Sequence, residues 1–399
     1  MPHLSQRASQ MPPSPIRKLV PYAEDAKKRG ITVYHLNIGQ PDIPTPQNML
    51  DAFRNHHITV LEYGHSAGLW EYREGLATYY QQYDINVSKE EIIVTTAGSE
   101  AIIFAMMATM DPGDEIIIPE PFYTNYNGFA REAGVTIVPV TSRAEDGFKL
   151  PPMDEIRSKI STRTRAIMIC NPNNPTGYVY TREEMQQLRD LVLEADLFFL
   201  TDEVYREFVY DGARHISVMH LEGIEDRAIL LDSISKRYSA CGARIGCLVS
   251  KNREILETVL RFGQARLCPP TLEQIAALAA LDTPQSYFDQ VLTEYRNRRE
   301  VVFEALSQIP GVVGQKPQGA FYTIVKLPVD DADNFCKWLL QDFHDNNETV
   351  MLAPANGFYA TPGLGKDEVR IAFVLNTRAM ARSMEILQKA LRVYPGRTG

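Results

Sequence analysis

A lysine stands at the carboxyl end of a predicted buried strand. Residues 228–232 are mostly apolar, and residues 233–236 (Ser-Ile-Ser-Lys) place Lys236 among small hydroxyl side chains. A lysine that loses its water in such surroundings is able to form a Schiff base with a carbonyl compound, whereas most lysines are simply solvated. Eight residues further along, Arg244 lies in residues 242–246 (Gly-Ala-Arg-Ile-Gly), where its planar guanidinium suits a phosphate group.

A turn of small residues follows the predicted strand at residues 92–95. Residues 96–100 (Thr-Ala-Gly-Ser-Glu) open a helix predicted at residues 99–110, so Gly98 and Ser99 lie where free backbone N–H groups favour an anion. Small side chains also let the backbone approach that anion closely. A strand-to-helix turn that merely needs a glycine accounts for the same residues.

Three further polar residues interrupt apolar or rigid segments. Asp202 follows the apolar run at residues 197–201, and its carboxylate needs a partner, either within the protein or as a cationic nitrogen of a ligand. Asn174 belongs to the turn at residues 171–177 (Asn-Pro-Asn-Asn-Pro-Thr-Gly) and carries an amide that is able to donate a hydrogen bond. Arg370 lies in an apolar strand and requires a carboxylate, either internal or from a ligand.

Together these residues provide a phosphate cradle, an anion for a ring nitrogen, a lysine for a Schiff base and an arginine for a carboxylate. Pyridoxal phosphate and an amino acid need these four groups. The sequence therefore predicts a site for both, provided that the fold brings Gly98 and Arg370 together.

Gly98, Asn174, Asp202 and Lys236 each come after a short apolar run of the length of a buried strand. Continuously apolar strands that alternate with helices are typical of a mostly parallel sheet covered by helices on both faces. Between two of these strands, Thr181 and Glu184 predict a capping box at the start of a helix. Ligands of such sheets bind beyond the carboxyl ends of the strands, where the candidate residues stand. The predicted strands span residues 92–95, 115–118, 136–140, 165–170, 197–201, 228–232 and 245–249.

The character of the chain changes at about residue 291. Charged helical segments at residues 291–308, 332–341 and 377–393 frame short strands at residues 321–325, 350–352 and 369–374, and the hydrophobic run 31–38 is expected to join them. We expect residues 49–290 to form a large α/β domain and residues 291–399 a smaller α+β domain. Residues 1–48 would be an N-terminal arm and part of the smaller domain.

The composition excludes several classes of protein. Lys and Arg number 41 and Asp and Glu number 50, and the net charge of −9 gives no general attraction to nucleic acid. The apolar runs are shorter than the roughly 18 residues that span a bilayer, and residues 1–15 lack the apolar core of a signal peptide. Five cysteines without a CxxC pair argue against a disulfide scaffold and a zinc site. We expect a cytoplasmic enzyme without a metal, a nucleic-acid partner or a membrane anchor.

Six motifs in their order along the chain resemble the class I/II pyridoxal-phosphate-dependent aminotransferases of fold type I, which are aspartate-aminotransferase-like. The resemblance extends from about Ser14 to the C-terminal helix. It implies a mostly parallel, mixed seven-stranded sheet, the cofactor pyridoxal 5′-phosphate and a homodimer. The motifs are residues 37–42 (Asn-Ile-Gly-Gln-Pro-Asp), 95–101 (Thr-Thr-Ala-Gly-Ser-Glu-Ala), 171–177, 202–205 (Asp-Glu-Val-Tyr), 233–236 and 242–246.

The resemblance assigns catalytic roles to three residues. Lys236 is the lysine that binds the cofactor and later moves the substrate proton. Asp202 pairs with the ring nitrogen, and Tyr205 donates a hydrogen bond to the ring oxygen O3′, as does Asn174. The resemblance further suggests that the Asn174–Pro175 bond is cis, a form that costs little before proline.

The remaining roles implied by the resemblance concern binding. Arg370 holds the α-carboxylate of the substrate together with Asn174 and the backbone of Gly39. Tyr123 stacks on the ring, where many relatives have tryptophan, and Tyr63 reaches the phosphate in the neighbouring subunit. The phosphate cradle consists of Gly98, Ser99, Ser233 and Arg244.

The substrate is less well defined than the cofactor. Aspartate with 2-oxoglutarate, in ping-pong kinetics, is favoured, and it requires a second cation for the distal carboxylate. Arg17, Arg261 and Arg266 are candidates for that cation, although arginines in such places are more often solvated or dimer-interface residues. An aminotransferase for aromatic, alanine or other neutral amino acids is an alternative, as is a C–S lyase or a related β/γ-elimination enzyme of the same fold.

Overall fold

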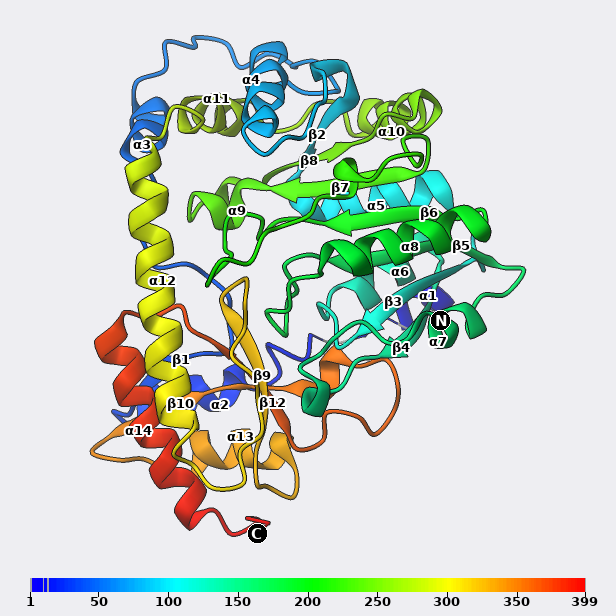
Figure 1. Cartoon of the computed structure of the whole chain (residues 1–399). Coiled ribbons are helices and arrows are strands. Elements are labelled where there is room, and N and C mark those ends of the chain that lie inside the picture. Colours follow the sequence, from blue (N-terminus) through cyan, green and yellow to red (C-terminus); the bar gives the residue numbers. More distant parts are fainter. Residues whose placement is uncertain (1, 10, 13, 399) are drawn as a thin grey trace.

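A seven-stranded sheet forms the centre of the fold (Figure 1). The computed structural model describes residues 2–9, 11–12 and 14–398. Strand β8 runs antiparallel to both of its neighbours and the other adjacent strands are parallel, so the predicted mixed, mostly parallel sheet is confirmed. In order across the sheet, the strands are β2 (Ile92–Thr96), β8 (Ile245–Val249), β7 (Ala228–Ser233), β6 (Phe198–Asp202), β5 (Thr164–Cys170), β3 (Glu115–Glu120) and β4 (Thr136–Thr141).

Helices cover both faces of this sheet because its strands are apolar on both sides. Along β5, Ala166 and Met168 pack into one hydrophobic core, whereas Ile167 and Ile169 pack into a second core. Successive strand residues point to opposite faces, so the two cores lie on opposite sides of the sheet. The first core includes residues of α5 (Ala97–Thr109) and α6 (Tyr126–Ala133), and the second includes residues of α4 (Trp70–Gln81), α8 (Arg182–Glu194) and α11 (Thr271–Ala280).

Sequence signals at two helix starts had different outcomes. The predicted capping box of α8 is present: the Glu184 backbone N–H donates to Thr181 Oγ1 over 3.2 Å, and the Thr181 backbone N–H donates to the Glu184 carboxylate over 2.8 Å. Helix α12 (Gln285–Leu306) begins directly after Pro284, so the predicted start at residue 291 was wrong. Proline is common at helix starts because its missing N–H would have no partner there, which makes Pro284 a better signal than the change in charge.

Strands from both ends of the chain form two smaller sheets. β1 (Thr32–His35) pairs in parallel with β10 (Glu348–Met351), so the run at residues 31–38 meets the C-terminal part of the chain. β12 (Glu368–Ala372) lies between β9 (Tyr322–Lys326) and β11 (Ala353–Pro354), antiparallel to both. α12 runs from α3 to α14 in Figure 1, and residue 290 lies within it. The division at that residue into large and small domains remains our proposal.

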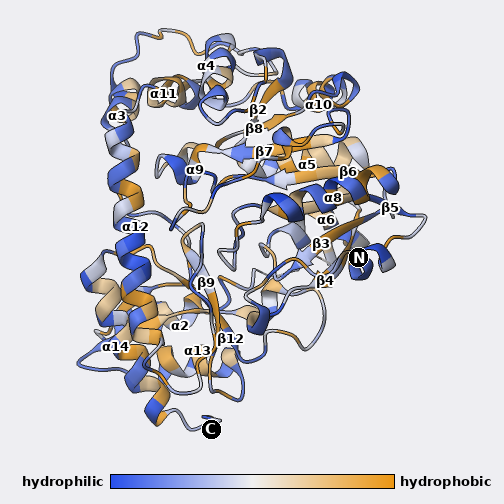
Figure 2. Ribbon diagram, viewed as in Figure 1, coloured by the Kyte–Doolittle hydropathy of each residue, from blue (hydrophilic) through white to orange (hydrophobic). Residues whose placement is uncertain are grey.

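Amphipathic helices complete the fold. Helix α14 (Thr377–Val393) shows both colours along its length in Figure 2, because Met380, Met384 and Leu387 are buried while Glu385 and Lys389 are exposed. In the described part of the chain, no helix combines the length and the apolarity needed to cross a bilayer. The other helices are α1 (Gln6–Ser9), α2 (Val20–Lys28), α3 (Gln47–Arg54), α7 (Met153–Ser158), α9 (Ile234–Arg237), α10 (Arg253–Arg266) and α13 (Ala332–Gln341).

Candidate active site

A cavity of about 520 Å³ lies at the carboxyl ends of β5, β6 and β7. Asn174, Asp202 and Ser233 line it where these strands end. Gly39, which follows β1, and Arg370, which belongs to β12, line it as well. The fold therefore brings together residues that are far apart in the sequence, as expected for ligand sites of such sheets. The predicted residues that line the cavity are Gly39, Gly98, Ser99, Tyr123, Asn174, Asp202, Tyr205, Ser233, Lys236, Arg244 and Arg370.

Lys236 projects from the single turn of α9 that follows β7. Its Nζ donates a hydrogen bond to the backbone oxygen of Gly39 over 2.9 Å and lies 3.6 Å from Cys241 Sγ. Burial works to lower the pKa of this lysine, but the nearby oxygen of Tyr322, the thiol of Cys241 and the oxygen of Tyr123 outweigh it and raise the pKa. The amine thus lies partly buried at the cavity wall, and among the described residues it forms no ion pair, which suits a group that must change partners.

Asp202 ends β6 as a buried carboxylate without a cation beside it among the described residues. Tyr126 Oη donates to its Oδ2 over 2.7 Å, and the Val204 backbone N–H donates to its Oδ1 over 3.3 Å. Burial raises the pKa of Asp202 to about 6 despite these two bonds, and the like charges of Asp232 and Glu203 act in the same direction. A cationic nitrogen placed against this carboxylate would relieve the cost of burying it, so Asp202 fits the ring nitrogen of pyridoxal phosphate.

Backbone geometry shapes the predicted phosphate cradle at the start of α5. Ala97 adopts a φ of +62°, and Gly98 and Ser99 follow it in the first turn of the helix. A Cβ atom at Gly246 would lie 2.4 Å from the Ala97 carbonyl carbon and 2.5 Å from the Gly98 nitrogen, so only glycine lets β8 approach this turn. Arg244 adopts a φ of +55° just before β8. Free N–H groups at the start of a 13-residue helix suit a phosphate.

The cradle is completed by hydroxyl and guanidinium groups. Ser233 Oγ donates to the Ile245 backbone oxygen over 2.9 Å, accepts from the Ser235 backbone N–H over 3.2 Å and lies 2.8 Å from Ser235 Oγ. Arg244 Nη1 donates to the Cys241 backbone oxygen over 3.1 Å, which leaves most of its donors for a ligand. Donors from three separate segments therefore face one end of the cavity and fit a phosphate group.

Arg370 is a buried cation that has no carboxylate partner among the described residues. Its Nη1 donates to Asn174 Oδ1 over 3.1 Å, its Nη2 donates to the Asn37 backbone oxygen over 2.5 Å, and its Nε has no partner there. The guanidinium lies 4.6 Å from the ring centre of Tyr322 and 4.8 Å from that of Phe358. Burial lowers the pKa of Arg370, which marks an uncompensated charge. An anionic ligand would compensate it.

Hydrogen bonds link Arg370 to the predicted catalytic residues. Asn174 Nδ2 donates to Tyr205 Oη over 3.2 Å, and Tyr205 Oη lies 3.0 Å from Tyr322 Oη. The cavity is therefore lined by a guanidinium at Arg370 that fits a carboxylate, by donors around Arg244 that fit a phosphate, and by the amine of Lys236. This arrangement is able to bind an aldehyde cofactor and an amino acid side by side.

The sequence predictions missed two residues of this site. Tyr322 lines the cavity beside Tyr205, and a Cβ atom at Gly39 would lie only 1.6 Å from its hydroxyl oxygen, so Gly39 and Tyr322 require each other. Tyr126 donates to Asp202 from helix α6. Tyr322 lies in a mostly apolar strand, and Tyr126 lies in a short segment of Thr, Asn and Gly. Neither pattern signals that the tyrosine hydroxyl faces a ligand or its carboxylate partner.

Not every predicted residue lies at the cavity. The side chain of Tyr63 is 80% exposed, and it does not line the cavity of its own chain. Arg17 lines the cavity, whereas Arg261 is exposed away from it and Arg266 lies 3.4 Å from the carboxylate of Glu100. That Tyr63, and Arg261 or Arg266, contribute to the site of a second subunit stays a prediction.

The prediction of a cis bond before Pro175 was wrong. Among the described residues, the cis peptide bonds are Glu120–Pro121 and Asn171–Pro172. The turn at residues 171–177 contains two Asn-Pro bonds, and because either can be cis at little cost, the sequence does not decide between them.

The chain is similar to aminotransferases of several named specificities. Residues 31–387 match the family model described as aminotransferase class I and II. An aspartate aminotransferase from Thermotoga maritima is 31% identical over 390 residues, which cover 97% of this chain and 99% of that protein. An aromatic-amino-acid aminotransferase from Thermococcus litoralis is 29% identical over 397 residues, which cover 98% of each. The solved structure of an alanine aminotransferase from Pyrococcus furiosus is 31% identical, has a TM-score of 0.88, and is matched over 97% of this chain and 99% of that chain.

Proposed function

This chain belongs to the class I and II aminotransferases, a family of pyridoxal-phosphate-dependent transaminases, and we propose that it moves the amino group of L-aspartate to 2-oxoglutarate in a ping-pong reaction. The observation that carries the proposal is Arg370, a buried guanidinium in the cavity with no carboxylate partner among the described residues. Lys236 lines the same cavity. A substrate that brings both a carboxylate and an amine satisfies the two groups together.

The proposed roles of the residues follow from their surroundings. When bound, pyridoxal phosphate accepts the electrons that remain as the Cα–H bond of the amino acid breaks. Asp202 supplies the buried negative charge that keeps the ring nitrogen protonated, and Tyr205 and Asn174 donate hydrogen bonds at the ring oxygen. Lys236 takes the Cα proton and returns it one position along, which requires Nζ within hydrogen-bond reach of both carbons. Arg370 fixes the α-carboxylate and thereby the Cα–H direction.

The preference for aspartate rests on Arg17. Arg17 lines the cavity and, among the described residues, its guanidinium has no hydrogen-bond or ion-pair partner. It belongs to the turn that precedes α2, and its neighbours Pro15 and Ile16 in this turn also line the cavity. A free guanidinium at this place suits the second carboxylate of aspartate and 2-oxoglutarate.

A second candidate, an aminotransferase of aromatic or other neutral amino acids, is favoured by the apolar part of the same wall. Ile16, Ile38, Ile102 and Phe129 line the cavity, and an uncharged side chain would bury its surface against them. A panel of donors, read as 2-oxo acid released per site without an acceptor, separates the two. Fastest release from aspartate supports our proposal, and fastest release from phenylalanine or alanine with no reaction of aspartate contradicts it.

We propose that two copies of the chain form the active unit. Val60, Leu61 and Tyr63 expose 68, 60 and 80% of their surfaces in one short segment, and a second copy that covered them would bury this apolar surface. Tyr63 would then reach the neighbouring phosphate cradle, as the resemblance implies.

Arg370→Lys is expected to lower kcat/KM about a hundredfold for every amino donor, because lysine keeps the charge but cannot form two parallel bonds to a carboxylate. The measurement is steady-state kinetics with aspartate, alanine and phenylalanine. Binding of the cofactor itself, followed by absorbance, should not change. A loss restricted to one donor, or no loss, would show that Arg370 does not hold the α-carboxylate.

Arg17→Met is expected to lower kcat/KM for aspartate about ten- to hundredfold, because a charge-assisted hydrogen bond is lost, and to leave the value for alanine unchanged. Arg261→Met is the matched control, since this exposed arginine does not line the cavity of its own chain. If Arg261→Met lowers the aspartate value instead, the partner subunit supplies the distal cation and the assignment of Arg17 is wrong.

A further inference from the structure

Four buried charged residues adjoin the active site without lining it. In the sequence, Glu203 follows Asp202, Arg206 follows Tyr205, Asp232 precedes Ser233 and Arg237 follows Lys236. Each cavity residue of this set thus has a charged neighbour that is at most 2% exposed and does not line the cavity. We refer to Glu203, Arg206, Asp232 and Arg237 as the ionic frame.

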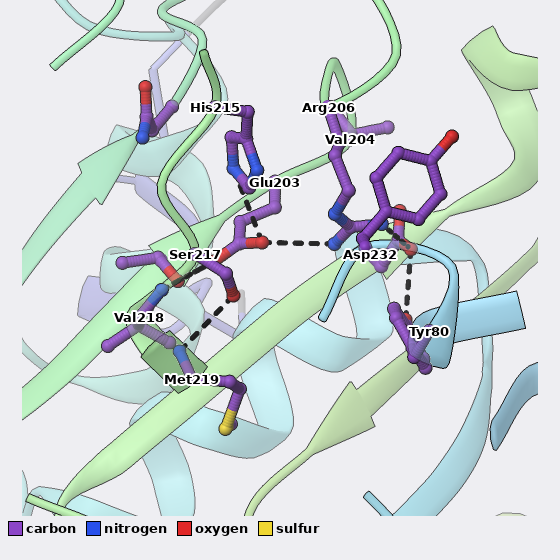
Figure 3. Close-up of polar contacts among 12 residues, drawn as sticks. Tyr80, Glu203, Val204, Arg206, His215, Ser217, Val218, Met219 and Asp232 are labelled. Atoms are coloured by element: carbon purple, nitrogen blue, oxygen red, sulfur yellow. Dashed lines mark hydrogen bonds and ion pairs between the residues drawn. The ribbon is translucent and has the colours of Figure 1, made fainter. Parts of the chain in front are cut away.

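The ionic frame is a continuous chain of ion pairs. Figure 3 shows Arg206 between Glu203 and Asp232, and its guanidinium nitrogens lie 3.0 Å from an oxygen of each. Arg237 Nη2 lies 2.6 Å from the same Asp232 oxygen, and Arg237 Nε lies 2.7 Å from Glu207 Oε1. Burial works to raise the pKa of Asp232, but Arg237 and Arg206 outweigh it and lower the pKa to about 2.

Further hydrogen bonds hold the two carboxylates of the frame. Tyr80 Oη donates to Asp232 Oδ2 over 2.9 Å (Figure 3). Glu203 Oε1 accepts from Ser217 Oγ over 2.9 Å and from the Val218 backbone N–H over 3.0 Å. Burial lowers the pKa of the adjacent His215 to about 4, so this imidazole adds no charge at neutral pH. The frame is thus held by hydrogen bonds from α4 and from residues 217 and 218.

The turn that carries Lys236 needs such support. Helix α9 has only four residues, and an isolated turn of this length does not hold its own conformation. Asp232 precedes α9 by two residues and Arg237 is its last residue, so their ion pair joins the strand before the turn to the end of the turn. Neither residue lines the cavity. Breaking a buried pair leaves an uncompensated charge, so the turn would have to move to relieve it.

We propose that the ionic frame positions the active site, and that Arg237 in particular fixes the turn that presents Lys236 and Ser233 to the cofactor. The inference rests on the transaminase function proposed above. In this role Arg237 is a positioning residue, because it touches neither cofactor nor substrate. The frame also links the Lys236 turn to Asp202 and Tyr205, so that the amine, the ring-nitrogen partner and the ring-oxygen partner keep one relative geometry.

Arg237→Met and Arg237→Lys test this role, with Arg299→Met as the matched control. Arg299 is equally buried and lies 2.7 Å from the carboxylate of Asp211, away from the cavity. For each variant we would measure Tm, the affinity of the cofactor-free protein for pyridoxal phosphate, the pH midpoint of the visible absorbance of the bound cofactor, and kcat and KM. The affinity for the cofactor and the pH midpoint are measured without an amino donor, so they do not depend on which donor the enzyme prefers. A parent protein that binds no pyridoxal phosphate would refute the proposed function rather than this inference.

Arg237→Met is expected to lower kcat at least about tenfold, because Lys236 would be misplaced for proton transfer. KM for the donor should change less than about threefold, because Arg370, which holds the donor carboxylate, stays in place. The pH midpoint should rise, since loss of a buried positive charge near Lys236 favours the protonated form of the group that titrates there. The kcat of Arg237→Lys should lie between those of the parent and of Arg237→Met. Arg299→Met should lower Tm without changing the pH midpoint or kcat.

The inference is overturned if Arg237→Met has a lowered Tm, as Arg299→Met does, but keeps the pH midpoint and the kcat of the parent. If Arg237→Met does not fold, the kcat of Arg237→Lys decides, because lysine retains the charge opposite Asp232 and is not expected to move the midpoint. A Lys variant with a lowered Tm and the parent kcat would equally show that the frame serves stability alone.

Discussion

Replacing Lys236 by alanine is expected to lower kcat by at least about 10⁴-fold, because one side chain supplies both the nucleophile and the proton carrier. The cofactor should still bind through the groups of the phosphate cradle. Borohydride treatment of the parent protein with pyridoxal phosphate, followed by peptide mass mapping, should locate a reduced adduct on Lys236, and the variant should lack it.

Lys251→Ala provides the control for this experiment, because Lys251 is an exposed lysine two residues after the neighbouring strand β8. It should retain both the adduct and the activity of the parent. An adduct on another lysine of the parent protein, or turnover by Lys236→Ala within tenfold of the parent, would contradict the assignment of Lys236.

Asp202→Asn is expected to have opposite effects on catalysis and on stability. Asparagine cannot keep the ring nitrogen protonated, so kcat should fall about 10³-fold or more although the cofactor remains bound. The same change removes a buried charge that the cofactor-free protein holds at a cost. We therefore expect the variant without cofactor to be more stable than the parent at pH 7.

The sign and the pH window follow from the pKa of Asp202, which burial raises from 3.8 to about 6. Between pH 4 and 6 the folded state binds more protons than the unfolded state, so the parent loses stability as pH rises through this range. The difference corresponds to about 3 kcal/mol above pH 6. Urea unfolding of both cofactor-free proteins from pH 4 to pH 8 should show free energies of unfolding that diverge in this window.

Asp196→Asn is the control, because Asp196 is exposed just before the other end of β6. It should follow the parent at every pH and retain full activity. Parallel curves for Asp202→Asn and the parent would mean that Asp202 is not desolvated in the folded protein, and retained turnover would mean that the ring nitrogen has another partner.

The strands and the site residues that follow them could be predicted because both depend on local patterns. β8 was predicted to the residue, and the capping box of Thr181 was found from two residue types at fixed spacing. Lys236 and Asp202 were found because polar residues rarely end fully apolar strands unless they serve a ligand or a partner. The topology rule then places the ends of parallel strands at one edge of the sheet.

The residues that could not be predicted depend on contacts between distant segments. Tyr322 faces the cavity because β9 lies beside Gly39, and nothing within β9 signals this contact. Arg206 and Arg237 read as ordinary charged residues, yet both are buried because they pair with Asp232, Arg206 from the loop after β6 and Arg237 from the turn after β7. Side-chain partners set by register and packing are not visible in single-sequence patterns.

The central claim, that the chain is a transaminase using Lys236 and Arg370, is tested most directly by its half-reaction. The protein loaded with pyridoxal phosphate is mixed with aspartate in the absence of a 2-oxo acid. Absorbance should move from about 420 nm to about 330 nm, with one oxaloacetate released per site and no free ammonia. Addition of 2-oxoglutarate should reverse the change. Release of free ammonia would instead indicate an elimination enzyme, and an unchanged spectrum with every amino acid would contradict the transaminase assignment.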